Sequence, residues 1–381
     1  MTSLMGTWMQ ITAQGFLVYE LTRSPQYLGY VGFAAGVPTW LLTLYGGVVA
    51  DRVSRRDLLV ITQTFMMLLA FGLAALWFLG IVQPWHIIVM AALLGLGNSF
   101  DAPARQAFVN ELVPREDLTN AIALNATMFN AATAIGPAIA GLAYAFFGAG
   151  WCFIINGLSF IAVIVALRRM KIEALERTAR GRGTLGDLIE GVRFVVTHPL
   201  IRVIIGIIAA TSMFALSLAT LIPAWSVNVL GGGAALNGAL LSARGIGSLI
   251  GALAIASLGR IAFRGRLLTL GTLAYPLLLA LFAVLRWIPL SLLVLAGVGM
   301  GTIFVMNLAN AMVQTSTPDH LRGRVMGAYT WIFFGFMPLG ALWTGLMAEH
   351  FGETAAVIVN AALAFAFCGA AFLFFPRLRR Q

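Results

Sequence analysis

Long apolar stretches separated by short polar turns dominate the pattern of this chain. Twelve of them are long enough, at about 20 residues each, to cross the hydrocarbon core of a bilayer as helices. They cover residues 1–20, 26–50, 57–80, 85–108, 118–147, 151–169, 200–229, 237–258, 267–285, 289–313, 323–347 and 352–375. Turn residues such as Ser24-Pro25 and Thr317-Pro318 mark the breaks. The pattern predicts an all-α membrane protein with twelve transmembrane helices.

One loop is longer than the others and divides the chain into two halves. It covers residues 170–199, and its apolar residues from Leu185 to Val196 recur at helical spacing. This predicts a cytoplasmic linker with an amphipathic helix on the membrane surface. We therefore expect an N-terminal six-helix bundle over 1–169 and a C-terminal one over 200–381. The first stretch has no basic residue before Arg23, which favours a truncated or misassigned start.

A weak internal repeat supports two pseudo-symmetric halves. Gly95, Gly97 and Phe100 in the fourth stretch recur 204 residues later in the tenth stretch. Repeated six-helix halves around a site near the bilayer midplane are a transporter architecture.

Composition excludes a water-soluble globule. The chain is 60% hydrophobic and only 10% charged, whereas soluble domains average about 25% charged residues. Its net charge of +10 follows from membrane topology rather than from nucleic-acid binding. Of the 24 basic residues, 21 fall in the loops or span ends assigned to the cytoplasm, only Arg23 and Arg286 fall in loops assigned to the outside, and only Arg244 is left inside a span. Because basic residues collect in cytoplasmic loops, both termini are expected in the cytoplasm.

Cysteines and histidines offer no metal or disulfide chemistry. Cys152 opens one apolar stretch and Cys368 lies deep in another, so their expected depths differ. All four histidines fall at segment ends. We expect no metal site and no cofactor.

The turn after the second stretch concentrates charge between two apolar runs. It reads Gly47-Val-Val-Ala-Asp51-Arg52-Val-Ser-Arg55-Arg56. The acid can accept from a facing helix N-terminus, and the arginines can bind carboxylates on neighbouring helices. A simple topogenic basic loop is the alternative. The pattern G-x-x-x-D-R-x-x-R-R resembles the loop 2–3 signature of the major facilitator superfamily. The resemblance implies a conformational latch that joins the two halves of a transporter at the cytoplasmic side.

A second charged pair ends the fourth stretch. Asp101 and Arg105 are four residues apart and can pair on one helix face, at a depth that Arg55 or Arg56 could reach. Ionisable groups at membrane depth are costly and often functional. Both a latch that breaks on opening and a static ion pair fit this pattern.

Further motifs narrow the resemblance to one branch of that superfamily. They are the run Asp101-Ala-Pro103-Ala-Arg105-Gln106, the run Leu321-Arg-Gly-Arg324-Val-Met-Gly327 and the segment Gly6-Thr-Trp-Met-Gln10. Together they resemble the bacterial branch of enterobactin-exporter-like proteins, or transmembrane secretion effectors. The resemblance covers nearly the whole chain and implies a multi-pass transporter of the bacterial inner membrane that acts as a monomer.

The fifth stretch carries a Gly-Pro motif. Gly136 and Pro137, followed by Gly141, fall in its outer half. Proline bends a helix and glycine permits close packing, so a packing kink explains them. They also resemble the antiporter motif of exporters in the superfamily, although Ala140 stands where the fuller motif has a second glycine.

Polar residues at helical spacing are candidates to line a central cavity. The candidates are Thr7, Gln10, Gln14, Asn98, Asn125, Arg244, Asn307, Asn310 and Trp331. Hydrogen bonding between helices or core packing is the alternative for each. Arg244 fits three roles: it pairs with an anionic substrate, pairs with Glu20, or extends toward the membrane surface.

The function expected from these features is export of a small amphipathic molecule, such as a drug or siderophore-like compound, by alternating access. Proton coupling is the usual expectation for such exporters, although only Glu20 and Asp101 approach the membrane core as carboxylates. Import of a small nutrient on the same scaffold is the alternative. An enzyme needs convergent acid, base or metal groups, which this pattern lacks, and a receptor would carry an additional soluble domain.

Overall fold

The computed structural model describes residues 1–114, 116–170, 185–257 and 264–375. Within these ranges it contains helices and no strands. The helices of the first half are α1 (Thr2–Thr22), α2 (Pro25–Arg52), α3 (Arg55–Phe78), α4 (Pro84–Leu112), α5 (Leu118–Phe147) and α6 (Ala149–Arg169). Those that follow are α7 (Leu185–Thr197), α8 (Pro199–Ala210), α9 (Leu218–Ala224), α10 (Ala234–Ser257), α11 (Arg264–Val284), α12 (Ile288–Ser316), α13 (Asp319–Phe351) and α14 (Glu353–Phe374).

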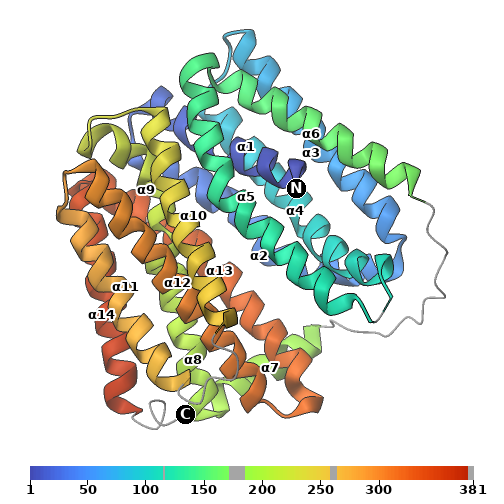
Figure 1. Ribbon diagram of the computed structural model, residues 1–381, viewed down its shortest axis with the longest axis vertical. Helices are drawn as coiled ribbons and strands as arrows, with labels where there is room; N and C mark the ends of the chain where they lie inside the picture. Colours follow the sequence, from blue (N-terminus) through green and yellow to red (C-terminus); the bar gives the residue numbers. More distant parts are fainter. Residues whose placement is uncertain (115, 171–184, 258–263, 376–381) are drawn as a thin grey trace.

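The helices form two bundles that meet along two helix pairs. In the first bundle, α2 packs on α4 and α3 packs on α6; in the second, α10 packs on α12 and α11 on α14. The bundles contact each other mainly where α2 meets α13 and where α5 meets α10. In Figure 1 the first bundle, in blue to green, lies beside the second, in yellow-green to red.

Eleven helical segments of the described residues are long and apolar enough to cross a membrane. The predicted count of twelve is therefore not exact by this measure. The missing one is α1, whose polar residues, among them Gln10 and Gln14, lower its hydropathy. It nevertheless has 21 residues and packs on α5 and α6 inside the first bundle.

The seventh span, Pro199–Val229, is not a uniform α-helix. Two π-helical segments, η1 (Thr211–Leu216) and η2 (Trp225–Val229), interrupt it on either side of α9. Widened turns of this kind are rare and are frequently found at functional sites.

The linker helix α7 packs on the second bundle through apolar residues, with Val195 buried and Leu188 and Val192 packed against the core cluster of that bundle, and it is also held by charge. Its residues Asp187 and Glu190 accept hydrogen bonds from the guanidinium of Arg324 on α13, at 3.0 and 2.5 Å. This contact fixes α7 beside the first turns of α13.

The internal repeat has a structural counterpart. A Cβ on Gly95 would lie 2.1 Å from the carbonyl oxygen of Ala35, and one on Gly299 would lie 2.0 Å from that of Arg244. Only glycine permits such close helix crossings. The α2–α4 crossing and the α10–α12 crossing are therefore equivalent in the two bundles.

Candidate functional site

The two ends of the molecule differ in how the bundles meet. We call the end that carries Arg52–Arg56 and Arg322–Arg324 the basic end, and the end that carries Ser24 and Glu349 the opposite end.

The pair α2–α13 is closely packed in its half nearer the opposite end. Gly29 and Gly345 face each other, and a Cβ on Gly345 would lie 2.7 Å from the Cα of Gly29. Further along, a Cβ on Gly36 would lie 2.6 Å from the Pro338 side chain. Small residues thus let the two backbones approach.

The pair α5–α10 repeats this arrangement with the Gly-Pro motif of the fifth stretch. A Cβ on Gly141 would lie 2.5 Å from the carbonyl oxygen of Ala234 and 3.0 Å from the Cα of Gly238. A Cβ on Gly238 would in turn lie 2.3 Å from the carbonyl oxygen of Pro137. Gly136 instead faces Trp8 of α1. Within the motif, Gly141 and Pro137 lie at the contact between bundles and Gly136 does not.

Two further features seal the opposite end. One apolar cluster there includes Leu17 and Tyr144 of the first bundle together with Ala224 and Ala234 of the second. In addition, the carboxylate of Glu349 on α13 accepts hydrogen bonds from Ser24 Oγ at 2.6 Å and from the backbone N–H of Gln26 at 3.2 Å.

Among the described residues, the close contacts between the bundles do not extend to the basic end. Toward that end of α2 and α13, the rings of Trp40 and Trp331 lie with their centroids 5.4 Å apart. Beyond this pair, Tyr45 is 60% exposed, and added Cβ atoms on Gly323 and Gly327 would meet nothing within 4 Å. In the part of the chain that the structure describes, the two bundles are therefore closed at the opposite end and separated at the basic end.

Three residues of the charged turn, Asp51, Arg55 and Arg56, bond within the first bundle. Arg55 forms ion pairs with Asp51 at 3.2 Å and with Glu111 at 2.9 Å, and Arg56 donates to the carbonyl of Arg168 at 2.7 Å. The Asp51 side chain remains 44% exposed. Arg52 is exposed, and an added Cβ on Gly47 would meet nothing within 4 Å. Among the described residues, no hydrogen bond or ion pair joins this turn to the second bundle.

Asp101 is the most deeply buried carboxylate of the site, with a 2% exposed side chain. It pairs with Arg105 at 2.5 Å and accepts from Thr62 Oγ1 at 3.0 Å and Gln63 Nε2 at 2.7 Å. The structure gives Asp101 no contact with Arg55 or Arg56, contrary to the expectation that one of them reaches it. Thr62 and Gln63 were not anticipated, because neither stands in a charged motif.

Two predicted cavity residues are instead part of the first bundle's core. Gln10 is 1% exposed and accepts from Asn156 Nδ2 at 2.5 Å. Gln14 is 3% exposed and donates to the carbonyl of Ile87 at 3.0 Å. The expectation that they line a cavity is corrected for this conformation, since both join helices by hydrogen bonds.

The other residues predicted to line the cavity are at least partly exposed. Thr7, Asn98, Asn125 and Trp331 are half-buried, Asn307 is exposed, and Asn310 is half-buried and accepts from Gln314 at 2.5 Å. Thr7 donates to the backbone of its own helix at 2.9 Å.

Arg244 on α10 does not pair with Glu20. The carboxylate of Glu20 accepts a hydrogen bond from the hydroxyl of Tyr144 instead. Arg244 is half-buried, and no ion pair joins it to any carboxylate of the described residues.

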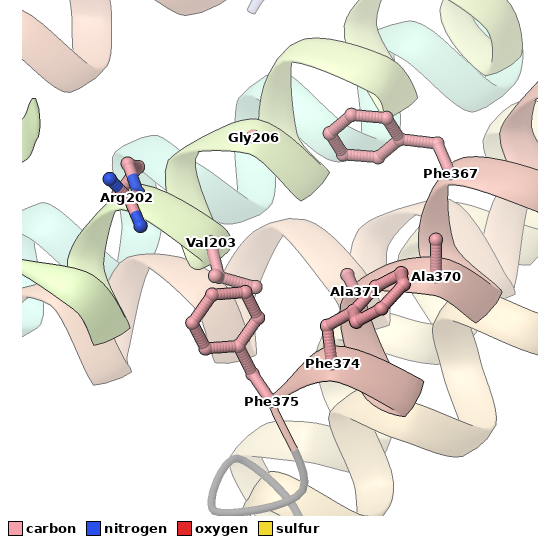
Figure 2. Close-up of a pocket in the computed structure, with 8 residues that line it drawn as sticks. All are labelled: Arg202, Val203, Gly206, Phe367, Ala370, Ala371, Phe374 and Phe375. Atoms are coloured by element: carbon pink, nitrogen blue, oxygen red, sulfur yellow. The ribbon is translucent and has the colours of Figure 1, made fainter.

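A groove between α8 and α14 lies apart from these contacts (Figure 2). It is lined by Arg202, Val203, Gly206, Phe367, Ala370, Ala371, Phe374 and Phe375. Figure 2 shows Val203 and Phe375 facing each other across it. Phe374 is 79% exposed, so the groove belongs to the outer surface of the second bundle and not to the contact between bundles.

A family profile described as transmembrane secretion effector matches residues 1–380. The chain belongs to this family.

Curated relatives of this transmembrane secretion effector are transport proteins. It is 27% identical over 388 residues to the multidrug efflux pump Tap of Mycolicibacterium fortuitum, covering 100% of this chain and 94% of the relative. It is 25% identical over 351 residues to the staphyloferrin A transporter of Staphylococcus aureus, covering 91% and 87%. It is 29% identical over 326 residues to the enterobactin exporter EntS of Shigella boydii, covering 82% and 74%.

Solved transporter structures share the fold. A bacterial homologue of the human lysosomal transporter Spinster matches with a TM-score of 0.77 at 13% identity, covering 99% of this chain and 97% of that one. The D-xylose–proton symporter matches with a TM-score of 0.73 at 14% identity, covering 100% and 98%. The predicted fold class, an all-α membrane protein with two bundles of the major facilitator type, is confirmed.

Proposed function

We propose that this protein is a secondary transporter that exports a small amphipathic molecule, of the drug or siderophore-like kind, by alternating access. The observation that carries the proposal is the difference between the two ends. The bundles are sealed through Gly141–Gly238, Gly29–Gly345 and Ser24–Glu349, and they separate toward the basic end. Rocking one bundle on the other would reverse these states around a fixed site.

Relatives favour the outward direction of transport. Two of them are named as an efflux pump and an exporter, and their similarity extends over most of this chain. The Gly-Pro motif of α5, of which Pro137 and Gly141 lie at the contact between bundles, fits an exporter in the same way.

The membrane orientation follows from charge. Basic residues collect on the cytoplasmic side of membranes, so the basic end faces the cytoplasm of a bacterial inner membrane and both termini lie there. The structure is then open to the cytoplasm, from which an exporter takes its cargo. The proposed units are residues 1–169, the linker 170–199 and residues 200–381, acting as a monomer without enzymatic activity.

The charged groups have different proposed roles. Gly47, Asp51, Arg52, Arg55 and Arg56 form the moving contact at the basic end. The buried pair Asp101–Arg105 stiffens α3 against α4 beneath them, since its bonds all lie in one bundle. The residues proposed to line the central cavity are Thr7, Asn98, Asn125, Arg244, Asn307, Asn310 and Trp331.

Protons are the proposed coupling ion. The two carboxylates near the membrane core are both hydrogen-bonded, Glu20 by Tyr144 and Asp101 by three partners.

Inverted vesicles, whose cytoplasmic face points outward, test the direction. They are incubated with amphipathic compounds of negative, neutral and positive charge under an imposed proton gradient. At least one compound should accumulate, and the accumulation should disappear with nigericin or in vesicles that lack the protein. Accumulation only in right-side-out vesicles would make this protein an importer.

A further inference from the structure

Arg244 is a cation in the middle of a membrane span. It lies ten residues into α10, about 15 Å from the start of this 24-residue helix. Its side chain is half-buried, and none of its N–H groups donates to a protein atom in the part of the chain that the structure describes. A charge at this depth is costly unless a partner of opposite charge compensates it.

The side chain lies on the inner face of α10. The most exposed apolar residues of this helix, Ile246, Ile250 and Leu253, are 47 to 57% exposed. At about 100° per residue they lie roughly half a turn around the helix from Arg244. Glycines at 245 and 247 pack against α5 and α12 on either side. Arg244 is therefore turned away from lipid, between α5 and α12.

Packing does not require an arginine at this position. In α10, Ser248 Oγ donates to the carbonyls of Arg244 and Gly299, at 3.1 and 3.2 Å. In α2, Thr39 Oγ1 makes the same two bonds to the carbonyls of Ala35 and Gly95, at 3.3 and 3.2 Å. The equivalent of Arg244 in the first bundle is thus Ala35. An alanine is sufficient for the same helix crossing, so the guanidinium is an addition that only the second bundle carries.

A second unpartnered polar group shares the inner face of α10. Asn237 lies seven residues before Arg244, which places it two turns away and within about 20° around the helix axis. It is 1% exposed, and both its amide nitrogen and its amide oxygen lack a hydrogen-bond partner. Buried amides without partners are rare in folded proteins and call for a ligand or ordered water.

We propose that the transported molecule carries a carboxylate, which the guanidinium of Arg244 binds, and a hydrogen-bonding group about 10 Å away, which Asn237 binds. This inference rests on the proposed transport function. A single guanidinium matches one carboxylate in charge and in bidentate geometry. Bound cargo would compensate a charge that the described residues leave without a counter-ion.

Binding to purified protein in lipid nanodiscs tests the inference without requiring transport. The probes are 2-naphthoate and 2-naphthamide, which share their shape and differ in charge, and the readout is titration calorimetry. Wild-type protein should bind the carboxylate about tenfold more tightly than the amide, as one charged hydrogen-bonded contact implies. Equal affinity for the two probes, or no binding of either, would overturn the inference.

Three variants test whether Arg244 is the residue that binds the carboxylate. Arg244→Gln should bring the naphthoate affinity down to that of naphthamide, whereas Arg244→Lys should retain part of the difference. Arg202→Gln removes an equivalent charge from the outer surface of α8 and should leave the difference intact. If Arg244→Gln does not fold, Arg244→Lys serves as the test. An unchanged preference for naphthoate over naphthamide, together with an unchanged affinity for naphthoate, would contradict bidentate binding by Arg244.

This result is separable from the proposed export. Selective naphthoate binding in a protein that moves nothing in inverted vesicles would refute export and leave the anion site standing. Export of neutral or cationic compounds by a protein that does not distinguish the two probes would refute the anion site and leave export standing.

Discussion

The carboxylate of Glu349, near the end of α13, caps the first turn of α2 through Ser24. The Oγ of Ser24 donates to it at 2.6 Å, and the N–H of Gln26 donates to the same oxygen at 3.2 Å. Ser24 is the N-cap residue of α2 and its own side chain caps nothing. A residue of the second bundle therefore satisfies the helix terminus of the first, where a negative charge is also favoured by the helix dipole.

Removing this cap should favour opening of the opposite end. Glu349→Ala deletes two hydrogen bonds to a charged acceptor, worth about 1–3 kcal/mol together in a partly exposed setting. A single cysteine at Leu17, buried in the seal, should then react faster with a thiol reagent added from outside in intact cells.

The matched control for this prediction is Asp319→Ala. Asp319 pairs with Arg322 at 2.5 Å within α13, at the other end of the helix that carries Glu349. The rate of labelling at position 17 should stay near that of the parent. Equal acceleration by both variants would mean that Glu349 does not join the bundles.

Side-chain volume at Gly141 should limit transport. Even the methyl group of alanine would meet the backbone of α10 at 2.5 Å, so Gly141→Ala should reduce the transport rate and Gly141→Leu should abolish it by holding α5 and α10 apart. Gly369→Leu is the control, because an added Cβ there meets nothing within 4 Å. Wild-type export rates for Gly141→Leu at matched membrane levels would contradict the role of this contact.

Asp101 should contribute to the stability of the first bundle. Its buried carboxylate compensates Arg105 and accepts from Thr62 and Gln63. Asp101→Leu leaves these donors unsatisfied and should destabilise the protein by about 3 kcal/mol, seen as a lower melting temperature in detergent. Asp319→Leu breaks a pair whose acid is 90% exposed and should change stability by less than about 1 kcal/mol. Similar losses for both variants would refute a special role for the buried pair.

Asp51 should act on the rate of transport and not on binding. It is exposed in this conformation and bonds only to Arg55 among the described residues. Asp51→Asn should slow transport in vesicles, because the bundles then close less readily at the basic end, while the affinity of purified protein for 2-naphthoate stays unchanged. A parallel loss of affinity would place Asp51 in the binding site instead.

Local features of the sequence predicted the fold well. The length of the apolar stretches, the turn residues and the distribution of arginines are each set by the bilayer, so the spans could be placed without tertiary information. The span of α1 was placed as well, although Gln10 and Gln14 lower the hydropathy of a helix that the first bundle encloses. The pair Asp101–Arg105 could also be predicted, since a spacing of four residues in a helix brings the two side chains together.

Contacts between distant segments could not be predicted from the sequence in this way. A polar stripe has the same spacing whether it faces water or another helix, so Gln10 and Gln14 could not be assigned from sequence. Glu349 looks like any charge at the end of a span, and only the packing of α13 on α2 gives it a partner. Arg244 was recognisable as an intramembrane charge, but its lack of a partner depends on every neighbouring helix.

Distances between spin labels measure the alternating opening of the two ends most directly. One pair replaces Tyr45 on α2 and Gly327 on α13 at the basic end, and the other replaces Gln26 and Phe351 at the opposite end. In Glu349→Ala protein, relative to the parent, the first distance should shorten while the second lengthens. Unchanged distances in both pairs, or a change of the same sign in both, would contradict alternating access.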